Sequence, residues 1–325
     1  PDNYKMIWTI RNEDFFFFFW GEPDFIRDHI RTNTHDFVGG YIIGSETYIP
    51  AKEYSLKQDV PEWKYAFQKQ WLFYALWGRL LYNPDMADET FEAMIDQRYG
   101  LGDIAGDFLQ ALQLGSRYPL KLASFYKASW DFTLYSEGFL ASAKSFGPFD
   151  GNPFISILEL IEHQTLDTNL VSIKEYVSQL DSRESIQDFK ITPLELADEL
   201  QSNAEKSLKL VHEIPHSDAQ NVSALQYELN DIRIWSHLSM YFAYKLRAGV
   251  EYETHREHGA GDHRSAAIEH LESALSHWEK LSEIADSIYL DVPLVHLPHQ
   301  KFHWSNFLED AKRDLIIVKG EVESW

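Results

Sequence analysis

Residues 6–10, Met-Ile-Trp-Thr-Ile, and residues 37–43, Phe-Val-Gly-Gly-Tyr-Ile-Ile, are the two stretches of this chain that most constrain its fold. Both are short apolar runs with β-branched residues, a composition typical of strands that are buried on both faces. Between them, Pro23 stands where the first turn of a helix would begin, and residues 24–31 have a helical pattern. This order predicts two parallel strands joined by a crossover helix.

Two parallel strands that are apolar on both faces need neighbouring strands in a sheet. The rest of the sequence contains no further convincing strand, so either the sheet is very small or the missing strands lie upstream of Pro1. We therefore expect residues 1–84 to be the terminal β/α units of a TIM-type barrel, and the chain to be a fragment of a longer protein.

A helix is expected from Pro61 to about Tyr82, with Phe67 on its apolar face. From residue 85 onward the pattern predicts helices only. The expected helices cover 88–99 with a stop at Gly100, 103–130 with a break at Pro119, 172–180, 192–212, 222–250, one from Asp262, and 304–322. The start at Thr192 is a capping box that Glu195 completes. Long amphipathic helices with short polar turns predict a helical bundle domain over residues 85–325, so the fold class is α/β followed by all-α.

The composition narrows the possible partners. The formal net charge is −22, which argues against nucleic-acid phosphates and anionic membrane surfaces because the summed field would repel them. The absence of cysteine excludes disulfides and thiolate zinc sites. The apolar run at 15–20 is too short to span a bilayer. The localisation stays open, and the periplasm or the cell exterior is favoured if the protein is bacterial.

Acidic residues follow both predicted strands, where barrel enzymes carry their reactive groups. Glu13 and Asp14 lie in the first loop, and Glu46 lies three residues beyond the end of the second strand. A glycosidase needs such a pair, since one carboxylic acid protonates the leaving oxygen while a carboxylate activates water or attacks carbon. The competing interpretation is that Glu13 and Asp14 cap a helix or pair with Arg11.

Further residues are candidates for substrate contact. Arg11 and Lys52 could clamp a substrate carboxylate, whereas Arg79 lies inside a helix and is expected to form a structural ion pair. Aromatic residues make up 15% of the chain, and although core packing is the favoured role for any single ring, Trp20 and Tyr48 lie beside the acids. The helical pattern is interrupted by a cluster that could complete a pocket, consisting of Trp130, Asp131, Tyr135 and Glu137.

Two clusters of histidines are candidates for a metal site, one of His255, His258 and His263 and one of His296, His299 and His303. Neither group has the helical spacing with a nearby acid that marks a zinc site, so solvated loop histidines are expected and no metal site is predicted. No phosphate-binding loop, dinucleotide fingerprint or nucleophile elbow is present, and no cofactor is expected.

Part of the chain resembles a known enzyme type. Residues 71–80, Trp-Leu-Phe-Tyr-Ala-Leu-Trp-Gly-Arg-Leu, are followed by Tyr82-Asn83-Pro84-Asp85 and by a helix that ends at Tyr99-Gly100. This pattern is similar to the end of the barrel in α-glucuronidase-type glycoside hydrolases, and Gly44-Ser45-Glu46 precedes it. The resemblance covers residues 1 to about 140. It implies a (β/α)8 barrel followed by a helical C-terminal domain, Glu46 as a catalytic carboxylate, and Glu13 or Asp14 as its partner or as a substrate ligand.

The leading hypothesis is part of a glycoside hydrolase that cleaves a plant or algal polysaccharide, with uronic acid units as one option, by two-carboxylate catalysis. The alternative is a non-catalytic helical glycan-binding protein of a bacterial polysaccharide-uptake system. Both imply a carbohydrate partner. A homodimer is a further option, since symmetric dimers are common in such families.

Overall fold

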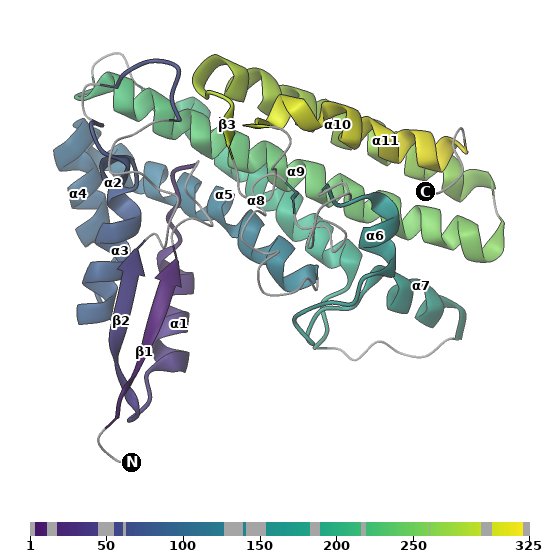
Figure 1. The fold of residues 1–325 in the computed structure, drawn as a ribbon, viewed down its shortest axis with the longest axis horizontal. Coiled ribbons are helices and arrows are strands. Elements are labelled where there is room, and N and C mark those ends of the chain that lie inside the picture. The colour runs from purple at the N-terminus through teal and green to yellow at the C-terminus, as the bar shows by residue number, and fades with distance from the viewer. Residues whose placement is uncertain are drawn as a thin grey trace. The chain divides into compact units, whose positions relative to one another are not determined.

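A computed structural model describes residues 4–11, 18–44, 55–60, 63–126, 139–140, 154–182, 189–215, 219–259, 261–293 and 301–320. Over these ranges the chain is mostly helical (Figure 1). It forms two compact units, one of residues 1–116 with 206–233 and one of residues 117–205 with 234–325. The helices α5 (Ala105–Phe125), α8 (Pro193–Glu213) and α9 (Val222–His258) contribute residues to both units.

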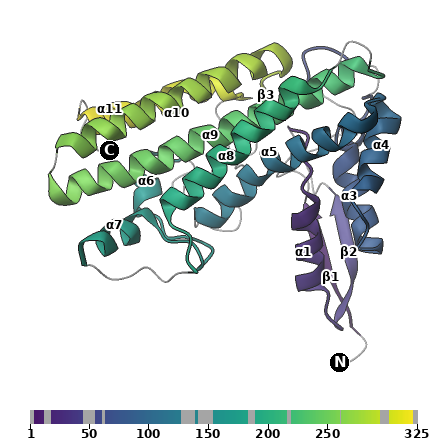
Figure 2. The ribbon, with the colours of Figure 1, turned by 180° about the vertical axis from the view of Figure 1, so that it is seen from behind.

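The first unit begins with the predicted β-α-β segment. Strand β1 (Met6–Arg11) pairs in parallel with β2 (Val38–Gly44), and α1 (Pro23–Asn33) connects them and lies alongside the pair (Figures 1 and 2). Pro23 occupies the first helical position, and the carboxylate of Glu22 accepts a hydrogen bond from the Phe25 backbone N–H. Both strands and the helix between them are therefore confirmed.

The two faces of this sheet differ. On one face Trp8 donates from its indole to the Asn33 carbonyl of α1 at 3.2 Å, and Tyr41 contacts the His29 ring of α1. On the other face Ile7 and Ile42 are 54% and 56% exposed. The prediction that the strands are buried on both faces is thus wrong for the described chain, because α1 covers only one face and no further strand among the described residues pairs with either edge.

Three more helices follow in this unit, namely α2 (Ala66–Lys69), α3 (Trp71–Tyr82) and α4 (Glu89–Tyr99). The single helix expected from Pro61 is instead two, and the second packs against α1. Phe67 does not face the core as expected, since 56% of it is exposed. Helix α4 ends as predicted at Gly100, whose φ of 68° lies in the left-handed region that favours glycine. A short 3-10 turn, η2 (Gly102–Ile104), leads into α5.

Helix α5 continues through Pro119, contrary to the break that the sequence predicts there. Proline in a helix interior removes one backbone hydrogen bond and costs about 3 kcal/mol. The nearby side chains of Tyr118 and Leu122 are fully buried or nearly so. Burial of such large apolar groups offsets a cost of that size, which explains why tertiary packing overrides the local signal.

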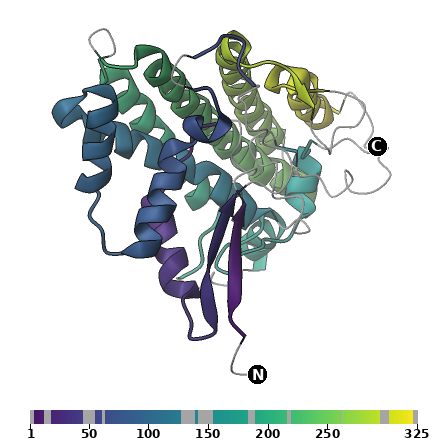
Figure 3. The ribbon, with the colours of Figure 1, turned by 60° about the vertical axis from the view of Figure 1, so that its left-hand side comes forward.

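The second unit is helical, with two two-residue strands that the sequence did not predict. Its remaining elements are α6 (Ile157–Glu162), α7 (Ile173–Ser182), α10 (Gly261–Ile288), β3 (Val292–Pro293), β4 (Lys301–Phe302), η5 (Trp304–Phe307) and α11 (Leu308–Lys319). Figure 3 shows α10 and α11 lying side by side. The capping box at Thr192 is confirmed, since its hydroxyl accepts from the Glu195 N–H while Glu195 accepts from the Thr192 N–H.

Candidate functional site

Most of the residues predicted to form the site lie outside the described ranges. These are Glu13, Asp14, Glu46, Tyr48, Lys52, Trp130, Asp131, Tyr135 and Glu137. Arg11 ends β1, and only its backbone is described. Their roles therefore stay predictions.

The strands that precede the two acidic loops are described, and they end at the same level. Arg11 is paired with Gly44 at the carboxyl end of the parallel ladder. Adjacent strands lie about 4.8 Å apart, so the two loops start side by side. Glu13 stands two residues beyond Arg11, and Glu46 stands two residues beyond Gly44.

Trp20, a predicted substrate contact, has none of its surface exposed. Its indole N–H donates to the Ser116 carbonyl at 3.1 Å, and its ring packs edge-on against Phe73. A side chain held in this way belongs to the core of the first unit.

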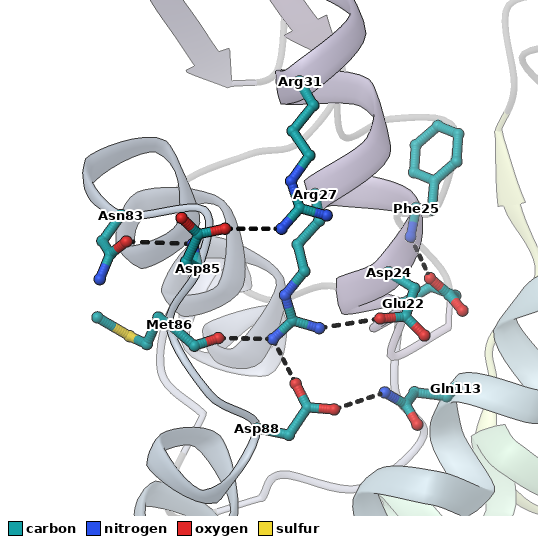
Figure 4. A network of polar contacts seen from close by, with 10 residues as sticks. All are labelled: Glu22, Asp24, Phe25, Arg27, Arg31, Asn83, Asp85, Met86, Asp88 and Gln113. Carbon is teal, nitrogen blue, oxygen red and sulfur yellow. Dashed lines mark hydrogen bonds and ion pairs between the residues drawn. The ribbon is translucent and has the colours of Figure 1, made fainter.

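The Asn-Pro-Asp turn that carried the family resemblance has a structural role (Figure 4). Arg27 of α1 donates to the Met86 carbonyl at 2.8 Å and to the Asp88 carboxylate at 2.5 Å, and it also pairs with Asp24. Arg31 pairs with Asp85 at 2.8 Å. These contacts tie α1 to the segment between α3 and α4, and the carboxylates involved are neutralised.

A pocket of about 470 Å³ lies on α2, α3 and α4 within the first unit. It is lined by Phe67, Gln68, Trp71, Tyr74 and Arg98. Three of the five lining side chains are aromatic and one is a cation. An apolar hollow with a few fixed polar groups is the usual form of a small-molecule site.

Arg98 is held in place by its neighbours. Its guanidinium group stacks over the Trp71 ring, 4.8 Å from the ring centroid, and its Nε–H donates to the Tyr99 hydroxyl at 3.0 Å. Within the described chain no carboxylate forms an ion pair with Arg98, whereas Arg27 pairs with both Asp24 and Asp88. Arg79, for which the sequence predicts such a pair, also has none in these ranges and lies exposed on α3.

A buried acid lies behind the pocket wall. Glu228 of α9 is completely buried and accepts hydrogen bonds from the Tyr99 hydroxyl at 2.5 Å and from the Trp71 indole at 3.0 Å. Burial raises the pKa of Glu228 to about 8 despite these donors and despite the nearby Arg98. At neutral pH the Glu228 side chain therefore carries a proton.

The histidines form no metal site in the described chain, where no group of three or more metal-ligating side chains occurs. His255 and His258 lie in the last turn of α9, and His263 Nδ1 lies 2.6 Å from the Glu251 carboxylate. His303 differs from the solvated loop residue that the sequence predicts, since it is only 2% exposed and caps η5.

A second hollow, in the second unit, has its charges internally paired. Its lining includes Lys174, which pairs with Glu162 at 2.6 Å, and Lys190, which lies 3.4 Å from Glu175.

Among the described helices, none combines the length and apolarity that crossing a membrane requires.

Among known proteins, a similarity in fold is found with a solved structure. No family model matches the chain, and no curated protein matches it. One solved structure, described as a GH138 enzyme targeting pectin rhamnogalacturonan II, superposes with a TM-score of 0.77 at 16% sequence identity. The chain has the fold of the matched part of that structure. The match covers 98% of this chain and 47% of the GH138 enzyme, so the chain spans about half the length of that protein.

The pocket around Arg98 is not predicted by the sequence. In the sequence, Trp71 and Tyr99 are noticed only as parts of the family pattern. Glu228 lies on a helix that the sequence marks mainly by its apolar residues. No local signal marks Arg98, because the setting of its side chain depends on contact with a helix far away in the sequence.

Proposed function

We propose that this chain is part of a glycoside hydrolase that acts on a plant polysaccharide. In this proposal residues 1–84 supply the last β/α units of a (β/α)8 barrel, and residues 85–325 follow as a helical domain. The fold shared with a GH138 enzyme over nearly all of the chain supports the assignment. At 16% identity this likeness concerns the fold alone.

The observation that carries the proposal is the half-covered parallel sheet. Ile7, Thr9 and Ile42 are exposed on the face away from α1, and neither edge of the pair meets another described strand. All-parallel sheets occur almost only where both faces are covered. Further parallel strands would bury these side chains inside a barrel, and burial of one isoleucine stabilises a fold by about 1.5–3 kcal/mol.

The chemistry follows from where the strands end. In a barrel of this kind the catalytic groups lie on the loops after the strands, and the loops that carry Glu13, Asp14 and Glu46 start side by side. One protonated carboxyl group would donate its proton to the glycosidic oxygen. A second, ionised carboxyl group would activate water or attack the anomeric carbon. Arg11, Tyr48 and Lys52, at the start of or within the same loops, would contact the sugar.

The test is hydrolysis by the full-length protein. Rhamnogalacturonan II oligosaccharides, glucuronides and galacturonides are assayed in parallel, because the α-glucuronidase type is a narrower form of the same proposal. Glu46→Gln is expected to lower kcat by roughly 10²–10⁴-fold, the usual contribution of a positioned acid or base. Glu309→Gln, a change at an exposed helix position, is the matched control and should leave turnover unchanged.

Two outcomes would count against the proposal. Unchanged turnover in Glu46→Gln removes Glu46 from catalysis and leaves Glu13→Gln and Asp14→Asn as the variants to compare. Binding of oligosaccharides without hydrolysis of any of them favours a glycan-binding protein instead.

A further inference from the structure

The pocket between α2, α3 and α4 is lined by Arg98, a cation whose side chain is held in place by its neighbours. The Arg98 Nε–H donates to the Tyr99 hydroxyl, and the guanidinium carbon lies over the Trp71 ring, 4.8 Å from its centroid. No described residue accepts a hydrogen bond from the two terminal nitrogens of Arg98. A guanidinium group fixed in this way presents two parallel N–H donors, the geometry that suits a carboxylate.

Among the described residues, no carboxylate forms an ion pair with Arg98. The nearby acid, Glu228, is protonated at neutral pH because burial raises its pKa to about 8. The other groups that act on Glu228 are Tyr99, Trp71 and Asp231, and Asp231 is a buried acceptor for the Phe19 N–H at 2.7 Å. The described lining of the pocket contains Arg98 and no acid, although the net charge of the chain is −22. A pocket with this lining favours an anion.

The remaining walls suit a sugar ring. Phe67 is 56% exposed, and its ring is stacked parallel to Tyr65 at 5.6 Å, which steadies it. Gln68 accepts hydrogen bonds from the Lys64 and Tyr65 N–H groups through its amide oxygen, so its orientation is set. This leaves an exposed aromatic face and an amide donor close to the arginine. The volume of about 470 Å³ is within the usual range for a small ligand.

We propose that this pocket binds a carboxylate-bearing sugar residue, with the two terminal nitrogens of Arg98 paired to the carboxylate and the sugar lying against Phe67 and Tyr74. The inference deepens the proposed function, on which it rests, by assigning the sugar class to a site outside the strand loops. It needs no catalysis, so its test is separate from hydrolysis.

The experiment is isothermal titration of the full-length protein with oligogalacturonides and with their methyl esters, which differ chiefly in charge. The acid form is expected to bind more tightly. Arg98→Gln should weaken binding of the acid form by about 10- to 100-fold, which corresponds to loss of a charge-assisted pair, and should leave the ester unaffected. Arg79→Gln, at an exposed position on α3, is the matched control and should change neither.

A second variant keeps the binding test valid if Arg98→Gln fails to fold. Phe67→Ala changes an exposed side chain, so it should fold, and it should weaken both the acid and the ester if the ring contacts the sugar. Equal affinity for acid and ester, or unchanged affinity in a folded Arg98→Gln, would overturn the inference. Benzoate binding as tightly as the oligogalacturonide would overturn the sugar class. Binding that survives without any hydrolysis would support this site while the proposed catalysis fails.

Discussion

Glu228 shows, at the scale of single residues, how one buried carboxyl group links stability to pH. Its pKa is raised from 4.5 to about 8 because it is removed from water, and two donors reach only one of its oxygens. Between pH 4.5 and pH 8 the folded chain binds a proton at this position that the unfolded chain has already lost. The free energy of unfolding must therefore fall as pH rises through this window.

Glu228→Gln keeps an oxygen that accepts from Tyr99 and Trp71 but cannot ionise. We expect the variant to lose the fall in stability between about pH 5 and pH 8.5 and to exceed the wild type near pH 9 by up to roughly 5 kcal/mol, at about 1.36 kcal/mol per pKa unit. Urea denaturation at a series of pH values measures this difference. Glu213→Gln, an exposed change in the same unit, should leave the pH dependence as it is. If Glu228→Gln keeps that dependence too, the buried proton is not at Glu228.

At the scale of elements, the two arginines of α1 make a natural comparison (Figure 4). The Arg27 side chain is 12% exposed and contacts Asp24, Met86 and Asp88. Arg31 is 52% exposed, and its partner Asp85 is 78% exposed. The same residue type, one helical turn apart, is thus placed in two different solvent environments.

We expect Arg27→Ala to lower the free energy of unfolding by about 2–3 kcal/mol, because it leaves the Met86 carbonyl without its side-chain donor and the half-buried Asp88 with only the long contact from Gln113, at 3.4 Å. Arg31→Ala should cost less than about 1 kcal/mol, as is usual for an exposed ion pair. Chemical denaturation of both variants provides the comparison. Equal losses would mean that the Asn-Pro-Asp turn is not anchored through Arg27.

At the scale of the whole molecule, the main feature is the face of the β1–β2 pair that α1 leaves exposed, because further strands could cover it. Ile42 is 56% exposed in the described chain, and so is Leu180 of α7. If further strands close a barrel over β1 and β2, Ile42 becomes a core residue in the full-length protein while Leu180 stays on the surface.

In the full-length protein Ile42→Asp should therefore cost about 2–4 kcal/mol, since it would place a carboxylate in an apolar interior. Leu180→Asp is the control and should stay within about 0.5 kcal/mol of the wild type. Thermal and urea unfolding of the two variants measure these costs. A small effect at both positions would show that no strand covers this face, and the barrel proposal would fail.

Elements with local signals were predictable from the amino-acid order. Strand composition identified β1 and β2, Pro23 marked the start of α1, Thr192 with Glu195 marked the start of α8, and Gly100 marked the end of α4. Each of these signals acts within a few residues, through a hydrogen bond, a fixed φ or the period of apolar side chains.

Other properties arise only in the folded chain. Pro119 remains helical because its neighbours are buried, Trp20 belongs to the core because Ser116 accepts its N–H, and Arg98 faces a pocket because Trp71 and Tyr99 hold it. Glu228 keeps its proton because α9 carries it out of water. These properties depend on residues far apart in the sequence, and burial and long-range contact are set by packing rather than by local pattern.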